Sequence, residues 1–108
     1  MHPSILFDSS DEDQHRRAFE LGTRILELCI EVGGTISGEH GIGLEKINQM
    51  CLQFSTVELQ QFHALKHAFD AKQLLNPGKQ IPTLARCAEF NAMRVHHGEM
   101  PFPHLERF

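Results

Sequence analysis

The chain has 108 residues, of which 41% are hydrophobic, and this is enough for one small domain with a core. Its net charge of −4, and aromatic residues that are all phenylalanine, argue against a surface that binds nucleic acid. No apolar run approaches the roughly 20 residues that a membrane-spanning helix needs, so no span is expected.

The first predicted elements are a short strand and a long helix. Residues 4–8 form an apolar run after Pro3, which a strand tolerates at its first position. Acidic residues follow Ser9 and Ser10, and they favour a helix start because hydroxyls cap the first turn and carboxylates stabilise its positive end. Apolar residues then recur at helical spacing as far as Val32, which is typical of a half-buried helix.

Residues 33–43 hold five glycines in eleven residues, with Glu39 and His40 at their centre. Glycine permits positive φ and close backbone approach. We therefore interpret the run as a short strand at 34–37 followed by a turn beside a site, which carries Glu39 and His40. Alternatively, the first two glycines cap the preceding helix and the others form an ordinary loop. The run matches neither a dinucleotide fingerprint nor a phosphate loop, so a nucleotide phosphate is not the expected ligand.

Two more helices are predicted after the glycine-rich run. Apolar residues at helical spacing over 44–54 indicate the first, and the sequence from Ser55 to Glu58 matches a capping box that begins the second. His63 and His67 lie four residues apart in the second helix and could share a metal ion, although no third ligand lies nearby in the sequence.

Helical periodicity fades in the C-terminal part. Residues 76–78 read Asn-Pro-Gly, which is turn chemistry, and residues 86–108 are predicted to form an extended tail that packs on this domain or on a partner. With three cysteines at wide spacings, neither a disulfide framework nor a zinc finger is expected, and a reducing cytoplasm is the simplest inference. A metal cluster in the tail is an alternative with irregular spacing, and its ligands would be Cys87, His96, His97 and His104.

Two motifs together resemble a known family. Gly-Gly-Thr-Ile-Ser-Gly-Glu-His-Gly-Ile-Gly at 33–43 and Leu-Leu-Asn-Pro-Gly-Lys at 74–79 are similar to the C-terminal end of FAD-linked oxidases of the vanillyl-alcohol oxidase type. These include D-lactate, D-2-hydroxyglutarate and glycolate dehydrogenases. Residues 45–51 and the tail most resemble the flavin subunit of bacterial glycolate oxidase, and residues 1–3 resemble the end of the family's His-x-Gly-Asp-Gly-Asn-x-His motif. The resemblance implies a C-terminal fragment of a larger flavoprotein.

The resemblance also implies an α+β fold. The chain would be a mostly helical fragment of a ferredoxin-like cap domain, with about three helices, two short strands and an irregular C-terminal tail. Residues 1–85 would belong to the cap domain, and residues 86–108 would serve packing or subunit contact. Apolar faces that normally meet the missing part would be exposed, and such patches favour self-association.

The implied activity is that of an FAD-dependent 2-hydroxy acid oxidoreductase, such as a glycolate dehydrogenase or oxidase, which passes hydride from the substrate α-carbon to the flavin. His2 and Glu39 would bind a divalent metal such as zinc, and His40 would be the catalytic base. Asn76 and Lys79 would lie at the cofactor. FAD would be bound mainly by the missing N-terminal part, so the isolated chain would be inactive.

The alternative function is a non-catalytic module that docks onto the other subunits of a glycolate oxidase complex. In the family these include a second flavin-type subunit and an iron–sulfur subunit. The expected location is the cytoplasm, with contact to the inner membrane only through such partner subunits.

Overall fold

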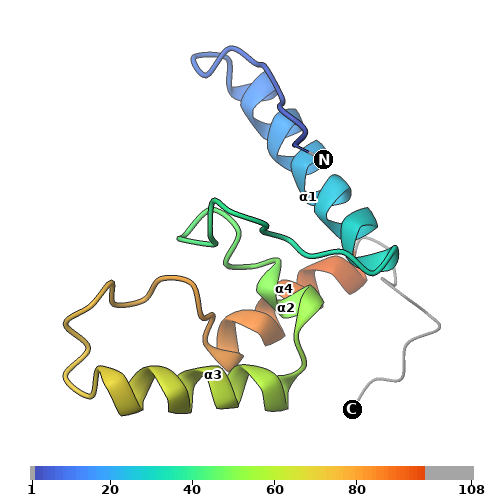
Figure 1. The fold of residues 1–108 in the computed structure, drawn as a ribbon. Helices are drawn as coiled ribbons and strands as arrows, with labels where there is room; N and C mark the ends of the chain where they lie inside the picture. Colours follow the sequence, from blue (N-terminus) through green and yellow to red (C-terminus); the bar gives the residue numbers. More distant parts are fainter. Residues whose placement is uncertain (1, 97–108) are drawn as a thin grey trace.

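The structure is a computed structural model, and it describes residues 2–96. Within that part the chain forms the helices α1 (Glu12–Glu31), α2 (Met50–Gln53), α3 (Thr56–Phe69) and α4 (Leu84–His96). The short α2 contacts both α1 and α4, whereas α1 and the far end of α3 project away from this centre (Figure 1). None of these helices is both long and apolar enough to cross a membrane.

Neither predicted strand is present in the described part of the chain. Residues 4–8 and 34–37 have no strand structure, so the mostly helical prediction is confirmed but the α+β class with two strands is not. A strand requires a second strand to pair with its backbone. In 34–37 the amide of Ile36 instead donates to the side-chain oxygen of Gln53 at 3.0 Å.

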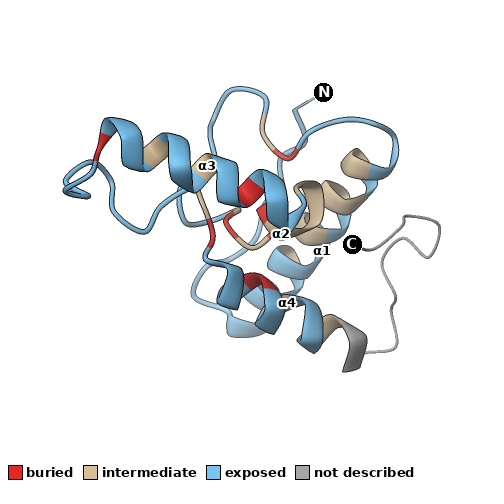
Figure 2. Cartoon of the chain, turned by 90° about the horizontal axis from the view of Figure 1, so that it is seen from below, coloured by how far each residue is buried: buried red, intermediate tan, exposed pale blue. Residues whose placement is uncertain are grey.

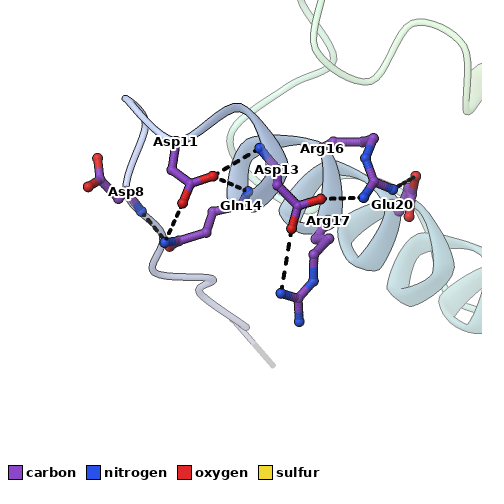
Figure 3. Close-up of polar contacts among 7 residues, drawn as sticks. All are labelled: Asp8, Asp11, Asp13, Gln14, Arg16, Arg17 and Glu20. Carbon is purple, nitrogen blue, oxygen red and sulfur yellow. Dashed lines mark hydrogen bonds and ion pairs between the residues drawn. The ribbon is translucent and has the colours of Figure 1, made fainter.

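The start of α1 agrees with the predicted polar cap, although the capping residue is Asp11 and not one of the two serines before it. The Asp11 carboxylate accepts hydrogen bonds from the amides of Gln14 and Asp13, and the bond from Gln14 lowers the pKa of Asp11 most. Figure 3 shows this helix start, together with the ion pairs that Arg16 makes to Asp13 and Glu20. These ion pairs are exposed, so they contribute little to stability.

The glycine pair ends α1, as the helix-cap alternative predicts. Gly33 has a φ of 82°, and its amide donates to the carbonyl of Ile30 at 3.0 Å. The amide of Gly34 donates to the carbonyl of Cys29 at 2.7 Å. A Cβ atom at Gly34 would lie 2.8 Å from that carbonyl oxygen, so both positions require glycine.

The core is small and surrounds α2. Ile36, Met50, Leu59 and Cys87 are buried together, and they come from the segment after α1 and from α2, α3 and α4 (Figure 2). Many large apolar side chains remain exposed outside this cluster, on all three longer helices and on the loops. This exposure agrees with the expected apolar faces, while self-association remains a prediction.

α4 replaces the first part of the predicted irregular tail, so that prediction is wrong for residues 86–96. Among residues 84–94 the buried apolar side chain is that of Cys87. An ion pair between Arg94 and Glu27 ties α4 to α1. The division between residues 1–85 and 86–108 falls inside α4, and the separate roles of the two parts remain predictions.

A disulfide between Cys51 and Cys87 joins α2 to α4, with the two Cα atoms 5.3 Å apart. The prediction that the three cysteines form no disulfide framework is therefore wrong for this pair, and Cys29 is the free cysteine. Widely spaced cysteines give no local signal of pairing, because the fold alone brings them together. Cys87 is consequently unavailable to the tail metal cluster, of which His97 and His104 lie outside the described residues.

Candidate active site

The structure brings His2 to the Glu39–His40 turn. The Nδ1 atom of His2 lies 3.3 Å from Oε1 of Glu39, and Nε2 of His40 lies 3.6 Å from the same oxygen. The two imidazole rings meet edge to face, with their centroids 4.9 Å apart. One ligand atom from each residue lies within 4.8 Å of the others, and no other cluster of this kind occurs within residues 2–96.

A hydrogen bond that spans Glu39 and His40 shapes the turn. The hydroxyl of Ser37 accepts a bond from the amide of Gly41 at 2.8 Å, and this bond closes the backbone around the two functional residues. Gly41 has a φ of 80°, which a residue with a side chain rarely adopts. Ser37 was not among the predicted site residues, although a serine before a glycine is a known turn signal.

The donor set of the cluster fits a divalent cation. Two imidazole nitrogens and a carboxylate oxygen are ligands that zinc and similar ions prefer. The side chains of His2, Glu39 and His40 are 61%, 74% and 66% exposed, so substrate or a further domain could reach them. The Glu39 carboxylate between the two imidazole rings provides the negative charge that a cation needs.

The predicted cofactor residues Asn76 and Lys79 lie in a second loop, residues 70–80, which follows α3. Both are exposed, and within the described part of the chain no hydrogen bond or ion pair joins them to His2, Glu39 or His40. The loop does reach the glycine-rich segment, because the amide of Gln80 donates to the carbonyl of Gly43 at 2.8 Å. The two sequence motifs are therefore neighbours, whereas their predicted functional side chains are not joined.

Asp70, which was not among the predicted site residues, organises this second loop. Its carboxylate is almost fully buried and accepts hydrogen bonds from the amides of Leu74 at 2.9 Å and Leu75 at 3.0 Å. Lys66 pairs with the same carboxylate and also donates to the carbonyl of Leu75 at 2.8 Å. The hydrogen bond from Lys66, followed by that from Leu74, lowers the pKa of Asp70.

The histidine pair on α3 does not form part of a three-residue ligand cluster in the region that the structure describes. The Nε2 atom of His63 lies 3.0 Å from the carbonyl oxygen of Pro82, so this histidine has a structural contact with the segment before α4. His67 is exposed. The geometry therefore favours the His2 cluster over the His63–His67 pair as a metal site.

The family described as "FAD linked oxidases, C-terminal domain" matches residues 1–80 of the chain. The chain belongs to this family. It is 68% identical to the glycolate oxidase subunit GlcD of Escherichia coli K12 over 108 residues, which is 100% of this chain and 22% of that protein. The same-named subunit of Bacillus subtilis is 37% identical over 80% of this chain and 18% of its own length.

A relative with a different printed name is a mitochondrial D-lactate dehydrogenase [cytochrome] from Arabidopsis thaliana. It is 35% identical over 75% of this chain and 14% of its own length. The chain thus spans less than a quarter of the length of each of these relatives. No solved structure shows a significant match.

Proposed function

We propose that the chain is the C-terminal, substrate-side portion of an FAD-dependent oxidoreductase that acts on glycolate or another small 2-hydroxy acid. The observation that carries this proposal is the convergence of His2, Glu39 and His40 in a domain of the FAD-linked oxidase family. The printed names of the relatives, glycolate oxidase subunit and D-lactate dehydrogenase, support this substrate class.

In this proposal His2 and Glu39 hold a divalent cation such as zinc. A bound cation would supply a Lewis acid for the oxygens of a 2-hydroxy acid. The Nε2 atom of His40, which faces the cluster, accepts the proton of the substrate hydroxyl. Bound FAD would supply the acceptor for hydride from the α-carbon, so that the alcohol becomes a carbonyl.

We further propose that Asn76 and Lys79 face the flavin. Their exposure and the contact of their loop with the glycine-rich segment support this placement. FAD would then be bound mainly by parts of the protein outside this chain, and the isolated chain would hold no FAD and oxidise no glycolate. Stoichiometric FAD on the purified chain would overturn that statement.

The metal proposal is tested by titrating the purified, tag-free chain with zinc in a calorimeter. Loss of even an outer-shell partner costs about 10- to 100-fold in metal affinity, so His2→Ala or Glu39→Gln should weaken zinc binding by at least this factor. His67→Ala and Glu45→Gln are matched controls, because each changes an exposed residue of the same type outside the cluster. Equal affinity in wild type and Glu39→Gln would overturn the proposed ligand set.

The role of His40 is tested separately from the role of the ligands. As a base, His40 can be replaced by alanine with little loss of zinc affinity, but oxidation of glycolate by the complete flavoprotein that contains this domain should fall at least about 100-fold. If His40→Ala lowers zinc affinity as much as Glu39→Gln does, then His40 is a third ligand and not the base.

A second role is favoured by the exposed apolar residues of α4 and by the word subunit in the relatives' names. Leu84 and Met93 lie exposed on this helix. We propose that α4 contacts other subunits of a glycolate oxidase complex, namely a second flavin-type subunit and an iron–sulfur subunit. Met93→Lys should reduce co-purification of these subunits without changing zinc affinity, and unchanged co-purification would argue against the contact.

The cytoplasmic location, with membrane contact only through such subunits, remains a prediction.

A further inference from the structure

We propose that Gln53 is a positioning residue for the turn that carries Glu39 and His40. This inference rests on the proposed metal and base roles of the turn. Gln53 ends α2, and its side-chain oxygen accepts a hydrogen bond from the amide of Ile36 at 3.0 Å. Its side-chain nitrogen lies 3.2 Å from the hydroxyl oxygen of Thr35 and donates to it.

Gln53 supplies the acceptor that a neighbouring strand would otherwise provide. The segment at 34–37 is not paired with a strand in the described part of the chain, yet the side chain of Ile36 is only 2% exposed. A buried backbone amide without a partner is costly, so the side chain of Gln53 fixes this part of the main chain as a ladder would. The contact spans 17 residues of sequence.

The tip of the turn has little packing to hold it in place. Added Cβ atoms at Gly38 and Gly41 would meet nothing within 4 Å, and the side chains of Glu39 and His40 are largely exposed. Two hydrogen bonds on its flanks therefore help to determine the path of the backbone. One joins Gln53 to Ile36 before the turn, and the other joins Ser37 to Gly41 across it. Loss of the bond between Gln53 and Ile36 would therefore shift the neighbouring Ser37, whose hydroxyl makes the bond across the turn.

The chain offers a matched control in Gln49, which immediately precedes α2. Gln49 is also a glutamine with a long-range bond, but its nitrogen donates to the hydroxyl of Thr23 on α1 at 3.0 Å. Gln49 is 2% exposed, so its loss should disturb stability at least as much as loss of Gln53. Of the two glutamines, Gln53 is the one whose side chain hydrogen-bonds to residues 35 and 36, which lead into the turn. If Gln53 only stabilised the fold, substitutions of Gln53 and of Gln49 would have the same effect on the zinc affinity of the site.

The test measures zinc affinity and backbone amide exchange on the tag-free chain. Gln53→Met keeps the length of the side chain but removes the acceptor, and we expect zinc affinity to fall about tenfold and exchange at residues 36–41 to rise. Gln53→Glu retains the acceptor for Ile36 and should restore affinity to within about threefold of wild type. Gln49→Met should lower thermal stability yet leave zinc affinity within about twofold.

Each outcome decides one of the two ideas. If the wild type binds zinc and Gln53→Met binds it equally well, the positioning role is overturned and the metal site stands. If the wild type binds no zinc but Gln53→Met alone raises exchange at residues 36–41, the metal proposal fails and the positioning role stands. Should Gln53→Met not fold, Thr35→Val removes the hydroxyl partner of Gln53 at an exposed position and should reduce zinc affinity about two- to threefold.

Discussion

The two loops that carry the family motifs are held in different ways. The first, residues 33–43, depends on the core, because Ile36 is buried in it and Gln53 reaches the loop from α2. The second, residues 70–80, is organised mainly by Asp70 and Lys66, which lie at the end of the helix just before it. Loosening the core should therefore disturb the first loop and leave the second largely intact.

The largest expected effect comes from removal of the disulfide between α2 and α4. The bond closes a loop with a sequence separation of 36. In the chain-entropy account a loop of this length is worth about 3 to 4 kcal/mol of unfolding free energy. The variant with both Cys51→Ser and Cys87→Ser should lose about this much in urea unfolding. Amide exchange should rise at residues 36–41 but not at 74–75.

Cys29→Ser is the control for this prediction, because it removes the free thiol and leaves the disulfide intact. It should leave exchange in both loops unchanged. An equal rise in exchange at 36–41 and at 74–75 after loss of the disulfide would contradict the distinction between the two loops.

The second prediction concerns a change at Asp70, which should raise amide exchange in the second loop and not in the first. Asp70→Asn removes the charged acceptor of the amides of Leu74 and Leu75, so exchange at these two positions should rise several-fold. Zinc affinity and exchange at residues 36–41 should not change. Asp13→Asn is a control that removes an exposed carboxylate from α1.

The lowered pKa of Asp70 gives this comparison a pH dependence with a definite sign. A carboxyl group whose pKa is lower in the folded state stabilises the fold fully above its unfolded pKa, close to the ordinary value of 3.8. That contribution is lost as the pH falls below this value and through the lowered pKa of the folded state. The protection of the Leu74 and Leu75 amides, taken relative to the intrinsic exchange rate at each pH, should therefore fall on acidification in wild type. The Asp70→Asn variant should show a smaller change in protection over the same pH range.

The sequence predicted those features whose partners lie close along the chain. The capping box of α3 is confirmed, since Ser55 and Glu58 bond to each other's amides, and the helix cap at Gly33 is confirmed as well. The Glu39–His40 turn was recognised from its glycines and from a family resemblance. Such features depend on local backbone geometry, which residue type reveals directly.

The missed features depend on contacts between distant segments. The strand predicted at 34–37 failed because β-branched residues favour a strand only where a partner strand is available, and here Gln53 takes that place. The link between Cys51 and Cys87 depends on how α4 packs against α2, which cysteine spacing does not reveal. Asp70 is the exception, because its partners lie within five residues and an aspartate at a helix end is a local turn signal.

The smallest expected effect tests whether damage to α3 spreads to either loop. Ser55 caps the start of α3, far along the helix from Asp70, and Ser55→Ala should cost about 1 kcal/mol of unfolding free energy. Hydrogen bonds from Ser55 lower the pKa of Glu58, so this part of the stability should also decline as the pH falls below the ordinary range of a glutamate. Zinc affinity and exchange at 74–75 should stay at wild-type values, because the contacts of Gln53 and Asp70 are untouched. A loss of zinc affinity in Ser55→Ala would mean that the start of α3 helps to hold the first loop, in addition to the packing of Leu59 with Ile36 in the core. The division between a core-held loop and a helix-held loop would then have to be abandoned.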